Sequence, residues 1–390
     1  MLSKRKKKYA MIFLGPFPKG NVSTLRIISY CKELVEQGHY VCVYLLAPTK
    51  ESGVNTERKG QFNGIDFIYV SKVTWRRNNV STLIKGGYYM YGVFAALFLL
   101  SKNKTDCILT YYFSPISNLV FGLYAKIRRI EFILDKTEYP KNFFNASSLK
   151  RKFIECNLRA FDKIITISHE LKSFYGRIVG NKNVFLLPMS IDPQRYSDII
   201  PYNNLHPYIA VVFGTHNRDN ILDSIKSYIE FSSYKQNRKV ELFLIGNYQK
   251  LIANHPSLSE MDCLIKNTPN IKVMGMIDNA LIPSFLKGAS CLLSTPVKYI
   301  SGGFPTKLGE YLLSGKPVVI TNVGEIPFYL KDNETAFLCN PGDITGIAKR
   351  IDDVFENYNR AKIVGDNGRN LALTVFNAKT YINELIDFIN

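Results

Sequence analysis

The sequence lacks paired cysteines and paired acidic residues of the kind that bind metals. Its seven cysteines are scattered along 390 residues, and no two form a Cys-x-x-Cys pair. An odd, dispersed set favours a reducing cytoplasm and argues against a disulfide framework and a zinc site. No Asp-x-Asp occurs, so the usual acidic clamp for a metal and a sugar nucleotide is missing. We therefore expect no metal in the site.

The glycine loops that bind phosphate in common nucleotide proteins are also missing. The first loop carries Gly15 and Gly20 but no Gly-x-Gly, and no Walker A sequence occurs, which excludes both fingerprints.

The apolar run YAMIFL after the basic start is too short for the core of a signal peptide. We expect a buried strand there, Gly15 on the acceptor side of a site, and no cofactor.

Acidic residues are scarce relative to basic ones. The chain has 32 Asp and Glu against 50 Lys and Arg, a formal net charge of +18, partly concentrated in KRKKK at residues 4–8 and in Arg76 and Arg77. This balance predicts attraction to an anionic surface, which could be lipid, nucleic acid or a phosphorylated substrate. A nucleic-acid binder is an alternative that the charge alone suggests. We expect no nucleic-acid partner, because the basic residues show no recognisable binding module or aromatic platform.

Long apolar runs are absent, with one near exception at residues 88–100, YYMYGVFAALFLL. Thirteen residues fall short of the roughly 20 that cross a bilayer. Our first interpretation is a core helix. The second is an interfacial helix, because Trp75, Arg76, Arg77 and Lys85 lie near it and suit a headgroup region. With the second interpretation, the cytoplasmic protein is peripheral on the inner face of the cell membrane.

Apolar segments alternate with helical ones along the whole chain. We expect strands at residues 9–14, 40–46, 65–70, 106–112, 131–135, 162–168 and 184–188, and then at 208–214, 240–246, 271–275, 290–295, 317–321 and 336–340. This alternation predicts an α/β protein with parallel sheets. Prolines and asparagines at 190–207 indicate a linker.

We therefore predict two doubly wound Rossmann-like domains that face each other across a cleft. The boundaries are 1–197 for an acceptor-binding domain and 198–390 for a donor-binding domain, with a last helix at about 376–390 that packs back on the first. Ligands in such sheets bind at the carboxyl ends of the strands.

The stretch from 301 to 330, SGGFPTKLGEYLLSGKPVVITNVGEIPFYL, carries the strongest local signals. Pro305 suits the first turn of a helix, good helix formers continue to residue 313, and Gly315 ends it. Free N–H groups at such a helix start let a phosphate approach. Lys307 and Glu310 share one helical face, which suits a nucleotide diphosphate. A solvated surface pair is an equal alternative.

At these residues the chain resembles the retaining GT-B glycosyltransferases of the large nucleotide-sugar-dependent family that includes sucrose synthase-like and bacterial polysaccharide (lipopolysaccharide and capsule) enzymes. The resemblance spans most of the chain and is strongest at GGFPTKLGEYLLSGKPVVITNVGEIPFYL. Weaker similarity lies in LVEQGHYVCVYLL, FDKIITISHEL, LLPMSID and KVMGMI.

The resemblance implies a donor site on the second domain. The family signature has two glutamates separated by seven residues. Glu310 matches the second, which holds the ribose hydroxyls, and Gly302 stands at the first. Polysaccharide enzymes of the family often have this variant. The donor-binding set that the resemblance implies is Glu310, Gly302, Gly303, Phe304, Pro305, Thr306, Lys298, Gly275 and Ile277, the last two in the loop against which the base packs.

The resemblance also implies basic residues that bind the diphosphate. Arg218 is the first candidate, followed by Lys307 and Lys298, while Thr215 replaces an arginine of the family. An arginine can grip two phosphate oxygens; the alternative for Arg218 is a solvated loop charge.

The acceptor side is less well marked. Many relatives have a histidine where this chain has Asp135 and Glu138, and either carboxylate could orient an acceptor hydroxyl. Asp135 could instead end a strand, and Glu138 could cap or pair locally. His169 is better explained as a polar residue at a helix start.

The implied function is transfer of a sugar from a UDP- or GDP-sugar to a hydroxyl of a glycan or lipid-linked acceptor, with retained configuration and without metal, in cell-surface polysaccharide synthesis. Arg218, Lys307 and Glu138 are the predicted catalytic residues. The alternatives are a catalytically silent binding subunit and a sugar-nucleotide epimerase on the same fold.

Overall fold

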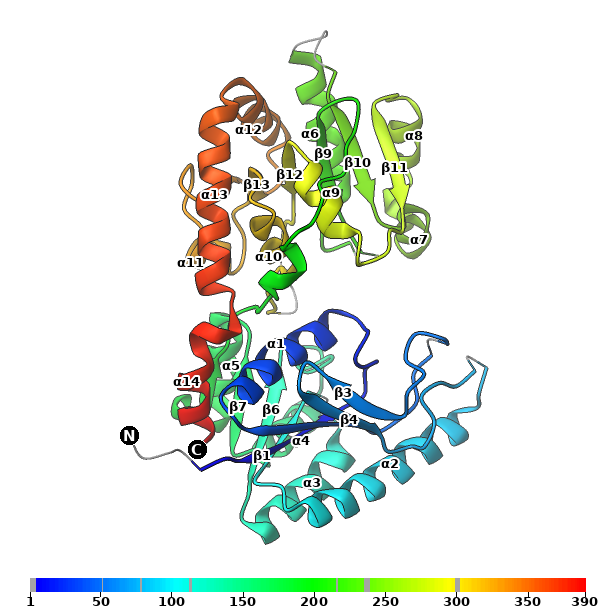
Figure 1. Cartoon of the computed structure of the whole chain (residues 1–390). Helices are drawn as coiled ribbons and strands as arrows, with labels where there is room; N and C mark the ends of the chain where they lie inside the picture. The colour runs from blue at the N-terminus through cyan, green and yellow to red at the C-terminus, as the bar shows by residue number, and fades with distance from the viewer. Residues whose placement is uncertain are drawn as a thin grey trace. The chain divides into compact units, whose positions relative to one another are not determined.

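The protein consists of two compact units (Figure 1). The computed structural model describes residues 5–50, 52–77, 79–111, 114–214, 217–234, 239–298 and 302–390. The N-terminal unit comprises residues 1–191, 301–303 and 377–390, and the C-terminal unit comprises residues 192–300 and 304–376. Lys4 of the basic run and Thr215 lie outside the described residues.

The N-terminal unit is built on an eight-stranded sheet with the order β3-β4-β2-β1-β5-β6-β7-β8. Neighbouring strands are parallel except β3 and β4, which form an antiparallel pair at one edge. The strands are β1 (Lys8–Phe13), β2 (Tyr40–Leu45), β3 (Lys59–Phe62), β4 (Ile65–Tyr69), β5 (Cys107–Thr110), β6 (Glu131–Lys136), β7 (Lys163–Thr166) and β8 (Val184–Leu186).

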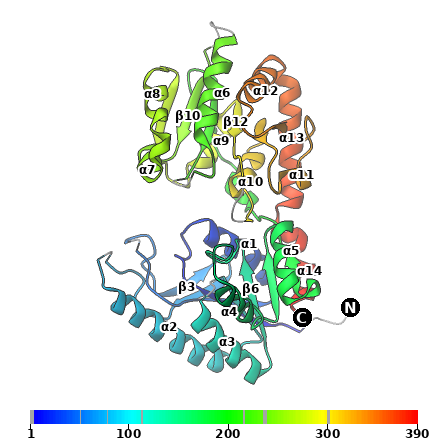
Figure 2. The same cartoon turned by 180° about the vertical axis from the view of Figure 1, so that it is seen from behind.

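Helices cover this sheet on both sides. They are α1 (Val22–Glu36), α2 (Thr82–Asn103), α3 (Pro115–Arg128), α4 (Ser148–Leu158), α5 (His169–Val179), the 3-10 turn η1 (Asn181–Asn183) and α14 (Ala378–Ile389). Helices α1 and α14 pack together in one apolar core with alternate residues of the strands. Helices α2 and α3 lie on the opposite side of the sheet from α1, as Figures 1 and 2 show.

The C-terminal unit is built on a six-stranded parallel sheet with the order β11-β10-β9-β12-β13-β14. The strands are β9 (Tyr208–Val212), β10 (Glu241–Ile245), β11 (Ile271–Gly275), β12 (Cys291–Ser294), β13 (Val318–Thr321) and β14 (Phe337–Cys339). The order reverses beside β9, because the chain adds β10 and β11 on one side and β12 to β14 on the other. Such a switch point is where parallel sheets bind ligands.

The helical elements of the C-terminal unit are η2 (Pro193–Tyr196), α6 (Ile221–Tyr234), α7 (Tyr248–Asn254), η3 (Pro256–Leu258), α8 (Glu260–Lys266), α9 (Ile282–Gly288), α10 (Thr306–Leu313), α11 (Ile326–Tyr329), α12 (Ile344–Glu356) and α13 (Tyr358–Val375). An apolar core joins α6 and α12 to the central strands.

The predicted α/β class is confirmed, and every predicted strand is present within a few residues of its predicted bounds. Strand β3 was not predicted, because its sequence KGQF has no apolar alternation and it lies largely exposed at the edge. The predicted helix at 306–313 is α10, and Gly315 ends it with φ +72°, a backbone conformation that suits glycine.

The interpretation of residues 88–100 as a core helix is only partly right, because Gly92, Val93, Ala96 and Leu100 are buried while Tyr91, Phe94 and Phe98 are exposed. They belong to α2, which has 22 residues and is the one helix among the described residues that is long and apolar enough to cross a membrane, by length and composition. Only 22% of its most apolar 18-residue window is buried. The apolar run looked short because a lysine and two glycines precede it, although those residues are also helical.

Candidate functional site

Helix α10 is held at the switch point of the C-terminal sheet by one buried tyrosine. The Tyr311 hydroxyl accepts a hydrogen bond from the Val212 backbone N–H at 2.7 Å and donates to the Leu293 carbonyl at 3.5 Å. Val212 ends β9 and Leu293 lies in β12, the two strands that flank the reversal. The start of α10 therefore lies at the carboxyl ends of the central strands.

The first turn of α10 has no side-chain cap. Pro305 is its N-cap residue, without a side chain that could accept from the first N–H groups. Leu308, Tyr311 and Leu312 are buried, while Lys307 and Glu310 are half-buried on the same face. The predicted approach of a phosphate to this helix start stays a prediction.

Lys307 and Glu310 each pair with another element, so the alternative of a mutual surface pair is wrong. The Lys307 ammonium donates to Asp219 Oδ2, and Arg195 Nη1 donates to Glu310 Oε1. The four side chains are 19 to 35% exposed. They form a charged cluster around α10, which we call the α10 cluster: Arg195, Glu310, Lys307 and Asp219.

Asp219, in the loop after β9, accepts hydrogen bonds from two donors, the Lys307 ammonium and a backbone N–H. Its Oδ2 also accepts from the Gly214 backbone N–H at 2.9 Å. Burial lowers the pKa of the Lys307 ammonium, the Asp219 carboxylate opposes that effect, and the positive charge of Arg218 lowers the pKa further. Arg218, itself exposed, therefore lies within electrostatic reach of Lys307. The predicted diphosphate residues Arg218 and Lys307 are brought together.

Arg195 was missed by the sequence analysis because it lies in the stretch interpreted as a linker. That stretch contains η2, whose N-cap Asp192 accepts from the Gln194 N–H at 3.0 Å. The turn directs Arg195 to Glu310, and its Nη2 also donates to the Asn279 carbonyl at 3.1 Å. A lone arginine among prolines and asparagines gave no signal for this role.

The loop predicted to pack against the base lies at the same edge of the sheet. Gly275 ends β11 with φ +68°, and its carbonyl accepts from the Gly246 N–H at 2.9 Å. Ile277 is half-buried. Arg195 links Asn279, two residues beyond Ile277, to Glu310 on α10, so the predicted base-binding and ribose-binding segments are connected.

Other predicted donor-binding residues lie outside the α10 cluster. The Phe304 ring is buried against Tyr329 and Phe376 at centroid distances of 5.5 and 5.3 Å, so its side chain belongs to the core. Thr306 is half-buried. Lys298 is exposed after β12, and no described contact joins it to the α10 cluster.

Gly302 and Gly303 belong by their contacts to the N-terminal unit. The Gly302 carbonyl accepts from Ser168 Oγ at 2.5 Å. Gly302 has φ +68°, and an added Cβ would lie 2.7 Å from the Tyr139 ring and 2.9 Å from Leu171. The backbone and the space at this position both fit glycine, which explains why the glutamate of the family signature is absent.

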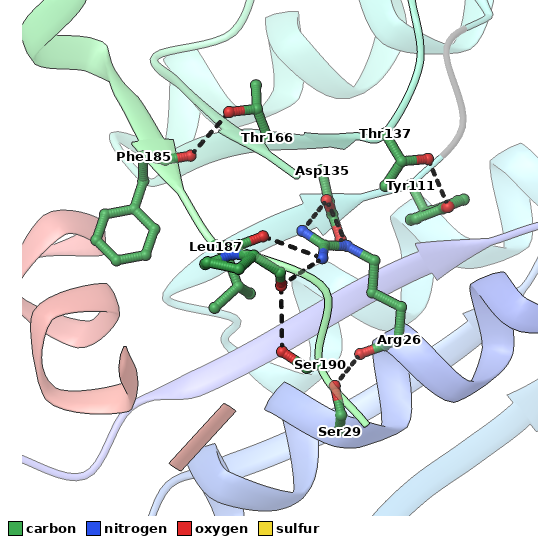
Figure 3. Close-up of polar contacts among 10 residues, drawn as sticks. Arg26, Ser29, Tyr111, Asp135, Thr137, Thr166, Phe185, Leu187 and Ser190 are labelled. Atoms are coloured by element: carbon green, nitrogen blue, oxygen red, sulfur yellow. Dashed lines mark hydrogen bonds and ion pairs between the residues drawn. The ribbon is translucent and has the colours of Figure 1, made fainter. Parts of the chain in front are cut away.

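Asp135 on the acceptor side is part of a buried ion pair (Figure 3). Arg26 Nε and Nη2 donate to its carboxylate at 3.0 to 3.2 Å, and Arg26 Nη1 donates to the Leu187 and Pro188 carbonyls at 3.2 and 3.3 Å. Burial alone would lower the pKa of Arg26, but Asp135 raises it above its ordinary value. The pair ties α1, β6 and the segment after β8 together.

Glu138 is the exposed carboxylate near this pair, three residues beyond Asp135. The Tyr175 hydroxyl donates to its backbone carbonyl at 2.8 Å, which fixes the loop. Lys136, which the sequence analysis passed over, lies between them; burial lowers the pKa of its ammonium, and Glu138 and Asp135 oppose the shift. Gly15 follows β1, where an added Cβ would meet the Phe13 ring at 2.3 Å.

No group of three His, Cys, Asp or Glu side chains that could hold a metal ion occurs within the part of the chain that the structure describes. Independence from metal stays a prediction.

Residues 202–371, nearly all in the C-terminal unit's sheet and its helices, match the family model described as "Glycosyl transferases group 1". This segment of the chain is similar to the group 1 glycosyltransferases. The chain is 22% identical over 247 residues to the capsular polysaccharide biosynthesis glycosyltransferase CapM of Staphylococcus aureus, an alignment that covers 63% of this chain and 60% of CapM. A shorter match, 36% over 53 residues, covers 14% of this chain and 7% of a trehalose phosphorylase of Grifola frondosa.

Solved structures show the same fold. A glycosyltransferase from Rickettsia africae ESF-5 aligns with a TM-score of 0.70 at 15% identity and covers 99% of this chain and 98% of its own. Anabaena Alr3699/HepE in complex with UDP-glucose aligns with a TM-score of 0.67 at 13% identity and covers 97% of this chain and 98% of its own. The fold of the chain is therefore GT-B.

Proposed function

We propose that the chain transfers a sugar from a nucleotide diphosphate sugar to a hydroxyl group, with retained configuration. The observation that carries the proposal is the α10 cluster at the switch point of the C-terminal sheet. Three of its four residues, Asp219, Lys307 and Glu310, lie inside the segment that matches the group 1 family. The similarity to a capsular enzyme and to a fold that holds UDP-glucose in Anabaena HepE supports a UDP- or GDP-sugar donor and a glycan or lipid-linked acceptor in polysaccharide synthesis.

In this proposal each charge of the α10 cluster has a role. The leaving diphosphate gains negative charge in the transition state, and Lys307 and Arg218 stabilise it together with the N–H groups at the start of α10. Glu310 accepts hydrogen bonds from the ribose hydroxyls. Both roles require the ligand to take over donors and acceptors that Asp219 and Arg195 occupy in the described structure.

The acceptor side needs no strong base of its own. The departing diphosphate oxygen can accept the proton of the attacking hydroxyl on the same face of the sugar, so the negative charge that forms is also neutralised there. Among the predicted acceptor residues, Glu138 is exposed and could orient the hydroxyl, whereas Asp135 is fully buried and occupied by Arg26.

The test is incubation of the purified chain with a panel of UDP- and GDP-sugars, with release of the nucleotide diphosphate measured with and without membrane lipid and glycan acceptors. A transferase releases nucleotide, and an acceptor increases the rate. A silent binding subunit is stabilised in thermal unfolding by a nucleotide but releases none, and an epimerase changes the sugar without release; either result would replace the proposal.

A further inference from the structure

Helix α2 exposes a stripe of large apolar side chains. Leu83, Phe94 and Phe98 are 88, 63 and 68% exposed, and Tyr91 is 45% exposed between them. They recur at helical spacing on the side opposite the residues that pack on the sheet, which are Gly92, Val93, Ala96 and Leu100. A single exposed apolar residue is ordinary, but a continuous stripe on one helix marks an interaction surface.

Helix α3 repeats the pattern beside α2. Ile116, Leu119, Leu123 and Ile127 are 64, 53, 62 and 70% exposed at spacings of three or four residues, so they form one helical face. Its other face is buried. The Tyr89 hydroxyl of α2 donates to Ser117 Oγ of α3 at 2.6 Å, and the two helices run side by side in Figures 1 and 2.

Helix α4, which contacts α3, adds Leu149 and Phe153 at 82 and 53% exposure. We call the exposed apolar side chains of α2, α3 and α4 the apolar face. Because three neighbouring helices contribute to it, the face is broader than a chance exposure on one helix.

The helices that carry the apolar face are strongly basic. Helix α2 contains two lysines, α3 contains Lys126 and Arg128, and α4 contains Lys150, Arg151 and Lys152, whereas Glu155 is the one acidic residue on the three helices. Apolar side chains flanked by cations are complementary to the boundary between acyl chains and anionic headgroups.

Two other occupants fit less well. A second copy of the chain would bring cations against cations across the interface, which is unfavourable. A membrane-spanning α2 would have to leave the sheet, yet α2 packs so closely at Gly92 that an added Cβ would lie 1.9 Å from the Leu46 carbonyl oxygen. The fold therefore holds α2 flat against the unit.

We propose that the apolar face docks on an anionic lipid surface, with α2 and α3 lying in the plane of the interface. The proposal is independent of the donor site, because it concerns a surface of the N-terminal unit and no residue of the α10 cluster. It assigns membrane contact to three helices, two of which carried no membrane signal in the sequence.

The experiment is flotation of the full chain with vesicles of phosphatidylcholine, alone or mixed with phosphatidylglycerol, at low and high salt. We expect binding to the mixed vesicles at low salt and much weaker binding at high salt. The double variants Phe94→Glu/Phe98→Glu on α2 and Leu119→Glu/Leu123→Glu on α3 should each weaken binding at least tenfold. Circular dichroism checks that they fold.

The matched control is Ile363→Glu on α13 of the C-terminal unit, a residue that is 61% exposed but isolated; it should bind like the unchanged chain. UDP binding should be the same for all variants, which separates this proposal from the proposed function. Equal and negligible flotation in every condition would overturn the proposal. The proposal would also be overturned if the two double variants lost self-association but kept vesicle binding, because the apolar face would then contact a second copy of the chain.

Discussion

The two units place ion pairs near strand ends in different ways. In the N-terminal unit, the side chains of Arg26 and Asp135 are 5 and 0% exposed, and two backbone carbonyls complete the hydrogen bonds of the guanidinium. In the C-terminal unit, the pairs of the α10 cluster are 19 to 35% exposed, and each joins a different element to α10. A charged residue at such a position is therefore not a ligand site by itself.

Burial determines what each pair can do. Separating a fully buried pair leaves a charge without solvent, so the Arg26–Asp135 pair stays closed and holds the fold. A half-exposed pair retains access to water, and its partners can be exchanged for a ligand's phosphate or hydroxyl at a much lower cost. We therefore expect a structural role for the Arg26–Asp135 pair and a binding role for the α10 cluster.

The largest effect should come from Asp135→Asn. It leaves the buried Arg26 without its counter-charge, and we expect a loss of about 3–5 kcal/mol in the free energy of unfolding of the N-terminal unit. Trp75, the single tryptophan, lies in that unit and reports its unfolding in a urea titration. The control Glu36→Gln removes the pair that Glu36, itself 48% exposed, makes with Lys32 at 4.0 Å in the same helix, α1, and should change little. If Asp135→Asn changed the free energy of unfolding only slightly, the buried pair would not have the structural role that we assign to it.

Glu310→Gln should give the next largest effect, on binding and not on folding. Loss of a charge-assisted hydrogen bond to the ribose should cost on the order of 1–3 kcal/mol in donor affinity or turnover, measured by calorimetry and by initial rates. Glu334→Gln, in an exposed pair with Lys331 at 3.5 Å in the same unit, is the control. Unchanged donor affinity and turnover for Glu310→Gln would contradict the proposal that Glu310 binds the ribose hydroxyls.

Asp219→Asn tests whether the Asp219 carboxylate competes with a diphosphate for Lys307. The amide oxygen can still accept from the Gly214 N–H, but the negative charge that competes with a diphosphate is gone. UDP should therefore bind more tightly, by about 1 kcal/mol, whereas Lys307→Met should weaken UDP binding. Weaker UDP binding by Asp219→Asn would instead mean that Asp219 positions Lys307 for the ligand.

The smallest effect should follow removal of divalent metal. If cationic side chains and a helix start neutralise the diphosphate, transfer survives EDTA with its rate unchanged within error. A complete loss that is restored by Mg²⁺ or Mn²⁺ would contradict the assignment of the diphosphate to Arg218 and Lys307.

The sequence was sufficient for the fold because β-branched runs and helical segments alternate strongly. It also placed α10, since Pro305 and Gly315 mark its ends. It could not show which charges pair, because the partners of Lys307 and Glu310 lie 88 and 115 residues away. Spacing within one helix contains no information about Asp219 or Arg195.

The sequence also could not show the burial of Asp135 or the exposure of the apolar side chains of α3. Nothing in FILDKTEYP indicates that Asp135 is fully buried, since its partner Arg26 comes from α1. The exposed stripe of α3 was missed because PISNLVFGLYAKIR is an ordinary amphipathic pattern, and only the structure shows that some of its apolar residues face outward.

The most direct test of the donor-site assignment is hydrogen exchange with and without a UDP-sugar, followed by mass spectrometry. The account predicts slower exchange in peptides that cover Thr306–Leu313, the loop after β9 and residues 275–279, and no change around Arg26 and Asp135. Protection confined to the region of Arg26 and Asp135, with α10 unaffected at saturating ligand, would contradict it.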